Sequence, residues 1–253
     1  MKTYIYKAVA GVCSLMLLMS SCESFLSEEP KDFLSPENLP NTEAECNMLL
    51  MGSLSYWRSN NFERHINFIA EATTDAVVSA TANNVARDEM NSLTWQSDNE
   101  SLYKPWQQFY ACINASNIMI EKVPNASKVS DEVKTRYVAA ARYMRAMSYF
   151  YLVRIFNDVI YLDTPVNDFT SANNMTKTPA KEIYNKIVED LEYAEANLPV
   201  KWDSGTERPT VAAAKSLLSW VYITMAGEQV KDNTMWAKAA SKAKEVIDLS
   251  LIH

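Results

Sequence analysis

Apolar and small residues recur at alternating steps of four and three along much of the chain, which is the spacing of one face of an α-helix. The clearest run begins after Ser130 and ends before Asn157. This spacing predicts one long helix with a continuous seam that faces a partner helix. The residues of the seam are Tyr137, Ala141, Met144, Ser148, Tyr151 and Ile155.

The same period, read between capping and helix-breaking residues, predicts further helices along the chain. They are expected at about residues 42–57, 67–78, 99–123, 179–197, 209–225 and 235–249. Segments 79–93 and 201–207 are polar and have no period, so we predict loops there. A short extended piece is expected at 159–162, and the strand content is otherwise predicted to be negligible.

The helices from residue 98 onward are joined by short connections, so we expect neighbours to pack as antiparallel hairpins. Hairpins that stack on one another form an α-solenoid. Ala146 and Phe150 have the A-x3-F spacing found in the second helix of tetratricopeptide repeats. We therefore predict an all-α fold of tetratricopeptide-like helical-hairpin repeats with irregular loops.

The first 21 residues have the pattern of a bacterial secretion signal. Lys2 and Lys7 precede the apolar stretch 8–19, and two serines then lead to Cys22. A cleaved leader typically has a positive start, a short apolar run and small residues before the cleavage site, as here. The apolar run is shorter than the roughly 20 residues needed to cross a bilayer. A cysteine directly after the cut resembles a lipoprotein box, although Met19 stands where leucine is more usual. The alternative is an ordinary secretory leader with an incidental cysteine.

Lipidation would make Cys22 the mature N-terminus, and two or more acyl chains would hold it to a membrane where one does not. Residues 22–40 are polar, rich in proline and without a period, which predicts a flexible tether. We assign the remainder, residues 41–253, to one helical-repeat domain.

Composition favours a binding protein over an enzyme. The net charge is −7, which argues against nucleic acid and against binding through anionic lipid headgroups. The four glycines form no phosphate-binding loop, and two histidines are too few for a zinc site or a Ser-His-Asp triad. We therefore expect no catalytic residues, no metal and no cofactor. Cys46 and Cys112 are expected as buried free thiols, with a disulfide as the alternative.

Several motifs, in order along essentially the whole chain, resemble the SusD/RagB family of nutrient-binding outer-membrane lipoproteins. The central motif comprises Ala141-Arg142-Tyr143-Met144-Arg145-Ala146, Tyr149-Phe150, Leu152-Val153-Arg154 and Phe156-Asn157-Asp158-Val159. Further matches are Cys22–Pro30, Trp106 with Tyr110, Ile113 and Asn117, the segment from Ile183 to Pro199, and the segment from Arg208 to Tyr222.

The chain departs from the family pattern in three ways. Asn157 stands where glycine is usual, but asparagine also tolerates the left-handed conformation of a helix cap. Ile160 replaces the usual proline. Family members are roughly twice as long, so we expect a fragment or a truncated form that corresponds to the N-terminal half. The last predicted helix would then leave an apolar face without a following helix, formed by Trp236, Ala239, Ala243, Val246 and Ile247.

The resemblance implies a surface-exposed, lipid-anchored protein of the cell outer membrane that takes part in polysaccharide utilisation. It would bind an oligosaccharide or similar nutrient and deliver it to a TonB-dependent, SusC-like transporter, which it covers as a lid. The helical half would be a scaffold and docking face, and the nutrient site would lie largely with loops and with the C-terminal half of the family, which is missing here. The alternative is a helical-repeat adaptor that binds protein partners without a glycan site. Acid pairs such as Glu189 and Asp190 do not indicate a glycosidase, because adjacent helical residues point in different directions.

A sugar site needs an aromatic platform with amide or charged side chains beside it. Such residues cluster near the predicted loop 79–93, and the candidates are Asn83, Asn84, Arg87, Trp95, Gln96 and Asp98. Trp95 is interpreted either as the platform or, preferably, as a core anchor of the loop. Arg142 and Arg145 are expected to be structural and paired with acids such as Glu71 or Asp75.

Overall fold

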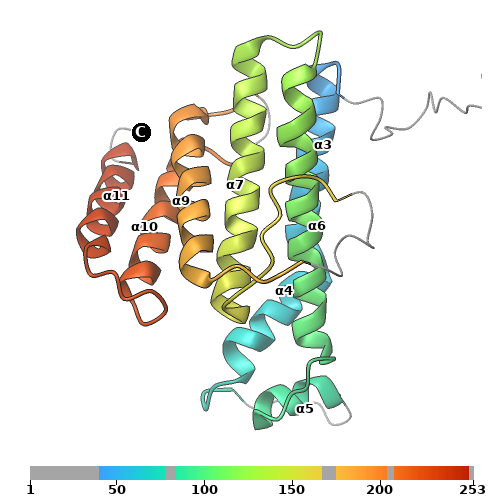
Figure 1. Cartoon of the computed structure of the whole chain (residues 1–253), viewed down its shortest axis with the longest axis vertical. Coiled ribbons are helices and arrows are strands. Elements are labelled where there is room, and N and C mark those ends of the chain that lie inside the picture. The colour runs from blue at the N-terminus through green and yellow to red at the C-terminus, as the bar shows by residue number, and fades with distance from the viewer. Residues whose placement is uncertain (1–39, 78–83, 167–174, 204–207, 251–253) are drawn as a thin grey trace, which may run out of the picture. The chain divides into compact units, whose positions relative to one another are not determined.

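The computed structural model describes residues 40–77, 84–166, 175–203 and 208–250, which all belong to one compact unit that begins at Leu39 (Figure 1). The predicted leader and the predicted lipid-attachment residue Cys22 lie outside the described residues. None of the described helices combines the length and the apolar character needed to cross a membrane.

The described residues are almost entirely helical, so the predicted all-α fold is confirmed. One isolated antiparallel bridge, between Val159 and Thr178, is the extended pairing among them. The helices are α3 (Glu43–Ser55), α4 (Asn60–Asn67), α5 (Val85–Ser92), α6 (Glu100–Lys122), α7 (Asp131–Phe156), α9 (Ala180–Asn197), α10 (Val211–Ala226) and α11 (Met235–Ser250). Three short turns are η1 (Tyr56–Arg58), the π-helical η2 (Phe68–Ala72) and η3 (Val123–Asn125).

Helices α6, α7, α9, α10 and α11 stand side by side in chain order, and α3 lies against α6 and α7 (Figure 1). Side-chain caps begin the first long helices. Thr42 and Glu45 form a capping box at α3, Asn99 caps α6, and Ser130 caps α7. At α9 the carboxylate Oδ1 of Asp158 accepts a hydrogen bond from the backbone N of Ala180 at 2.9 Å. The end of α7 therefore caps the start of α9.

Two predictions between residues 60 and 93 are wrong. The helix expected at 67–78 is instead α4, which ends at Asn67, followed by the π-helical turn η2. The loop expected at 79–93 contains α5, which Asn84 caps by accepting a hydrogen bond from the backbone N of Arg87 at 3.1 Å. Helix α5 buries Met90 alone among its residues, so its sequence has no apolar stripe that could reveal it.

The seam of α7 is buried over most of its length. Tyr137, Met144 and Ser148 are fully enclosed between α3, α6 and α9, whereas Tyr151 and Ile155 are only partly buried. The two predicted free thiols, Cys46 and Cys112, are confirmed as buried and unpaired. Burial raises the pKa of Cys46 to about 11, so this thiol stays protonated at neutral pH.

A buried ionic group joins α6, α7 and α9. Arg145 donates from Nε and Nη2 to the two carboxylate oxygens of Asp190, at 2.7 and 2.8 Å, and from Nη1 to Asn117 Oδ1 at 2.8 Å. Arg142 Nη1 lies 3.8 Å from Asp190 Oδ1. The expected pairing of these arginines with Glu71 or Asp75 is therefore wrong, because an acid from the neighbouring helix α9 takes that place.

Beyond the Val159–Thr178 bridge, the segment that follows α7 is held by side chains of α6 and α7. The hydroxyl of Tyr149 accepts a hydrogen bond from Leu162 N at 2.6 Å and donates one to Leu162 O at 3.2 Å. The hydroxyl of Tyr110 likewise accepts from Ile160 N at 3.0 Å and donates to Ile160 O at 2.9 Å. Asn117 donates to the carbonyl oxygens of Leu162 and Thr164. Helices α6 and α7 thereby satisfy the backbone of a strand-like piece that has no sheet.

Helix α11 packs on α10 through one face and exposes another. Ala239 is buried, and its carbonyl accepts a hydrogen bond from the hydroxyl of Ser219 on α10 at 2.9 Å. Trp236 and Ile247 are both more than half exposed. The predicted apolar face is therefore divided between a packed part and an exposed part.

Candidate functional site

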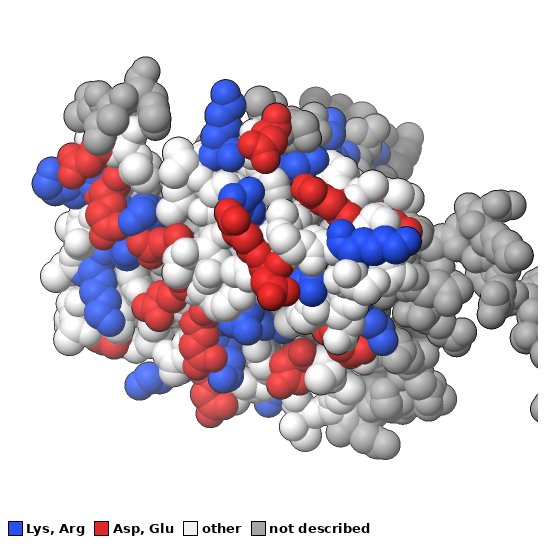
Figure 2. Space-filling view, turned by 90° about the horizontal axis from the view of Figure 1, so that it is seen from above, with Lys and Arg blue, Asp and Glu red and all other residues white. Residues whose placement is uncertain are grey.

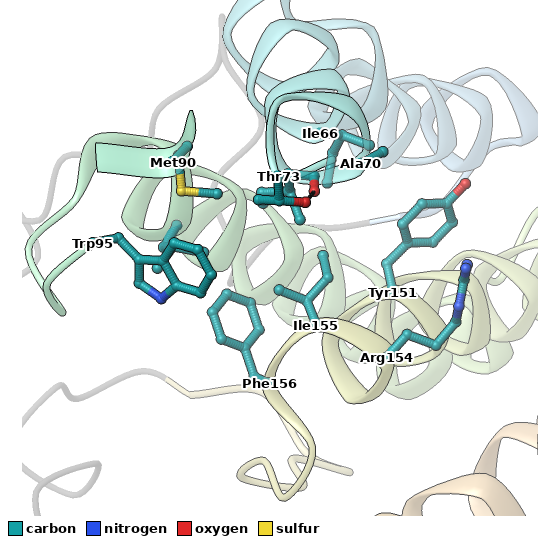
Figure 3. Close-up of a pocket in the computed structure, with 11 residues that line it drawn as sticks. Ile66, Ala70, Thr73, Met90, Trp95, Tyr151, Arg154, Ile155 and Phe156 are labelled. Carbon is teal, nitrogen blue, oxygen red and sulfur yellow. Dashed lines mark hydrogen bonds between the residues drawn. The ribbon is translucent and has the colours of Figure 1, made fainter. Parts of the chain in front are cut away.

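A cavity of about 470 Å³ lies between the α4–η2 segment, the α5–α6 turn and the last two turns of α7 (Figure 3). Its walls are mostly aliphatic and aromatic, with a few polar groups. The lining residues are Ile66, Ile69, Ala70, Thr73, Met90, Trp95, Leu102, Tyr151, Arg154, Ile155 and Phe156.

The aromatic walls are braced by further rings behind them. Phe156 meets Trp106 edge to face with the ring centroids 4.9 Å apart, and Tyr151 meets Trp57 in the same manner at 5.1 Å. Such edge-to-face pairs stabilise ring orientation beyond the burial of area alone. The two rings therefore present defined faces and edges to the cavity.

Trp95 lies in the turn between α5 and α6, and both ends of that turn are anchored. Leu93 adopts φ of 57°, the left-handed conformation that ends α5. Asn99 donates from Nδ2 to Ala86 O at 3.0 Å and to Glu89 Oε2 at 2.7 Å, which ties the start of α6 to α5. Trp95 itself is 39% exposed, so its indole is available at the cavity mouth.

The π-helical turn η2 forms the opposite wall. It widens the helical turn so that Ile69, Ala70 and, just beyond it, Thr73 face the cavity. Thr73 Oγ1 donates to Ile69 O at 2.9 Å, which satisfies one carbonyl of this irregular turn. Single π-helical turns inside helices occur frequently at functional sites.

Arg154 is the charged residue of the lining and lies at one end of the cavity beside Tyr151 (Figure 3). Its guanidinium carbon lies 5.0 Å from the ring centroid of Trp220, 5.1 Å from that of Phe150 and 5.8 Å from that of Tyr151. These distances are within the range of cation–π attraction.

The structure brings only one of the four principal candidates into the cavity. Trp95 lines it and is not a buried core anchor, so that interpretation of Trp95 is wrong. Arg87 stacks over Phe68 instead, with its guanidinium carbon 4.5 Å from the ring centroid. Asp98 is exposed and outside the lining, and Asn83 lies outside the described residues.

The two secondary candidates are also outside the lining. Asn84 caps α5, and Gln96 is exposed and accepts a backbone hydrogen bond from Asn99 N at 3.1 Å. In the part of the chain that the structure describes, no group of three or more His, Cys, Asp or Glu side chains is placed to hold a metal ion.

Comparison with known proteins identifies the family. The SusD-like family, described as "Starch-binding associating with outer membrane", matches residues 24–223. The chain belongs to the SusD-like family. A SusD-like protein of Formosa agariphila, P2, is 33% identical over 240 residues, which are 92% of this chain and 45% of that protein.

Solved SusD-like structures share the fold. A SusD homologue from Bacteroides thetaiotaomicron superposes with a TM-score of 0.74 at 24% identity, over 88% of this chain and 43% of that one. A structure named as a laminarin-binding SusD-like protein gives a TM-score of 0.71 at 24% identity, over 82% of this chain and 44% of that one. The chain therefore spans a little under half the length of the SusD-like proteins it matches.

Sequence reasoning missed most of the cavity of this SusD-like chain. The sequence pattern places Tyr151 and Ile155 on a seam that packs on a helix, and Arg154 and Phe156 stand out only as parts of the family motif. One available signal was the excess of aromatic residues near the end of α7, where Tyr149, Phe150, Tyr151 and Phe156 exceed what one packed stripe requires. The sequence carries no signal of the cavity wall formed by α4 and η2, because its pattern predicts a regular helix there.

Proposed function

We propose that this chain is the helical part of an outer-membrane glycan receptor that binds an oligosaccharide in the cavity beside Trp95. The observation that carries the proposal is an aromatic-walled cavity with a half-exposed tryptophan at its mouth, in a chain of the SusD-like family. The name of the laminarin-binding relative adds support, because laminarin is a polysaccharide.

The chemistry of the cavity suits a sugar ring. A pyranose has apolar C–H faces and a rim of hydroxyls, so it stacks on an aromatic surface while polar groups beside that surface fix its orientation. The indole of Trp95 offers the surface. The hydroxyl of Tyr151 and the guanidinium of Arg154 offer donors, and the hydroxyl of Thr73, which donates to Ile69 O, offers an acceptor.

Membrane attachment through Cys22 is the second part of the proposal. The leader pattern of residues 1–21 and the family's description as associating with the outer membrane support it. Replacement Cys22→Ala should release the protein from the outer-membrane fraction and abolish labelling by fatty acid. A variant that still sediments with the membrane, with no label in either form, would rule out the lipid anchor.

The third part is a partnership with a TonB-dependent transporter that imports the bound oligosaccharide. The support is the family membership, together with the predicted export and surface location. Co-purification of the full chain with such a transporter from its own outer membrane tests this part independently of sugar binding.

Binding is tested with the full chain purified in detergent, screened on a glycan array and then titrated by calorimetry with the best oligosaccharide. Trp95→Ala should weaken binding by roughly tenfold or more, since aromatic anchors carry much of the energy of such sites. Trp236→Ala is the matched control, because Trp236 is 51% exposed on α11 and lies outside the cavity lining. Equal losses in both variants would contradict the site. Absence of any glycan binding would favour the adaptor.

A further inference from the structure

Arg154 differs from the other arginines of α7 in its partners. Arg136 pairs with Glu132 one turn earlier on the same helix, and Arg142 and Arg145 both reach Asp190. Within the described residues, Arg154 has no carboxylate at salt-bridge distance and no hydrogen-bond acceptor. Its described neighbours are the three aromatic rings that surround it.

This arrangement leaves the donors of Arg154 available. A guanidinium attracted to ring faces is held in position by them, while its five N–H groups point outward in its own plane. Two of these N–H groups match the spacing of the two oxygens of a carboxylate or of a sulfate ester. The ring cluster therefore orients a donor pair without using it.

The charge of Arg154 is also not neutralised within the cavity lining. Every other lining residue is uncharged, and most are apolar, so no carboxylate of the lining competes with a ligand for the guanidinium. On the face of the molecule seen in Figure 2, by contrast, acidic and basic side chains are interspersed. Elsewhere on α7, Lys134 forms an ion pair with Asp131.

We propose that the cavity selects an acidic oligosaccharide, whose carboxylate or sulfate group binds the guanidinium of Arg154. Trp95 and Arg154 lie toward opposite ends of the cavity, with Ile155 and Phe156 between them (Figure 3). A sugar ring stacked on Trp95 would thus direct a neighbouring acidic group to Arg154. This inference rests on the proposed glycan binding and adds the class of glycan.

The test compares three oligosaccharides of equal length, namely a hexuronate oligomer, a sulfated oligomer and a neutral oligomer, each titrated into the full chain in detergent. Arg154→Met keeps an apolar chain against the rings and removes the charge. It should weaken binding of an acidic oligomer roughly tenfold or more and weaken binding of the neutral oligomer much less, because the neutral oligomer loses at most one uncharged contact. Arg154→Lys should be intermediate, because it keeps the charge and loses the paired donors.

Arg136→Met near the start of α7, outside the cavity lining, is the matched control and should leave all three affinities unchanged. Raised salt should weaken binding of the acidic oligomers to the wild-type chain more than to Arg154→Met. The two acidic oligomers distinguish a preference for carboxylate from one for sulfate. If the neutral oligomer binds as well as both acidic ones, or if Arg154→Met binds all three like wild type, this inference is overturned while the proposed function stands. If no oligomer binds, the proposed function fails.

Discussion

Arg145 and Arg154 lie nine positions apart on helix α7 and have opposite surroundings. Arg145 is buried and uses three of its donor atoms on Asp190 and Asn117. Arg154 is exposed at the cavity end and is surrounded by rings. Burial disfavours the charged form of Arg145, but the bonds to Asp190 outweigh it and raise the pKa of the guanidinium.

The difference shows that α7 has two roles along its length. Its middle part, from Tyr137 to Phe150, is largely buried and uses charge to join helices. Its last two turns line the cavity, where the guanidinium of Arg154 has no carboxylate partner among the described residues. An arginine whose donors are all satisfied internally serves the fold, whereas one with oriented and unused donors is suited to a ligand.

The largest expected effect comes from removing the acid of the buried pair. Asp190→Ala should lower the free energy of unfolding by about 3–5 kcal/mol, because it leaves the Arg145 charge buried without its partner. The measurement is urea unfolding followed by circular dichroism. Glu189→Ala is the control, since Glu189 is exposed and its pair with Lys186 is a surface pair worth about 0–1 kcal/mol.

A double variant sharpens the same comparison. Replacing Arg145 by Met and Asp190 by Leu together should destabilise less than the sum of the two single changes, because neither partner is left as an unpaired charge. Strict additivity would mean that the two side chains do not act as a pair. Arg154→Met should be far milder than Arg145→Met in the same assay.

The next effect concerns the segment held by tyrosine hydroxyls. Tyr149→Phe removes the hydroxyl that bonds both N and O of Leu162, and should cost about 1–3 kcal/mol, because the part-buried N of Leu162 is left without this partner while Asn117 still donates to Leu162 O. Tyr103→Phe is the matched control, because Tyr103 is exposed and its hydroxyl bonds only to Gln107. Equal unfolding midpoints for the two variants would contradict the proposed support of this segment.

Sequence patterns predicted the helices whose signals are local. Thr42, Asn99 and Ser130 each begin a helix because their side chains bond within three residues, and the stripes that follow them are long. Helix α5 was missed because it is short and buries one residue. The partner of Arg145 was missed because it lies 45 positions away, and local spacing carries no such information.

The candidate site was predicted only at Trp95. A seam shows that Tyr151 and Ile155 face inward, but it does not show whether another helix fills the space they face. The structure leaves that space open, and the same spacing that predicts packing at Tyr137 and Met144 therefore lines a cavity two turns later.

A smaller effect is expected at the end of α7, between the two regions. Asn157 has φ of 60° and ψ of −110°, so the expected positive φ is present, but ψ is outside the left-handed helical range. Glycine adopts such angles without strain, so Asn157→Gly should raise the unfolding free energy by about 0.5–1 kcal/mol. The gain is limited by the lost contacts of the Asn157 side chain with Asp158 and Gln229.

Asn157→Ala is the informative counterpart, because it loses the same contacts and keeps the Cβ. It should be less stable than wild type in urea, whereas the glycine variant is more stable. If both changes destabilise equally, the side-chain contacts outweigh the backbone strain at this position.

The smallest expected effect is a pH dependence of the unfolding free energy that arises at His65, next to the cavity-lining residue Ile66. His65 is buried in α4, and its Nδ1 lies 3.3 Å from Ser101 Oγ. Burial lowers the pKa of His65, and the cations Lys104, Arg64 and Arg87 add to that effect against the attraction of Glu100.

The sign follows from proton binding. Because the pKa of His65 is lower in the folded chain than the ordinary value of about 6.5, the unfolded chain binds more protons as the pH falls below that value. Stability should therefore decline from pH 7 to 5.5, and His65→Asn should reduce the decline while preserving a polar contact to Ser101. His253→Asn controls for the other histidine of the chain. An unchanged decline in His65→Asn would mean that carboxylates, not His65, set the pH response.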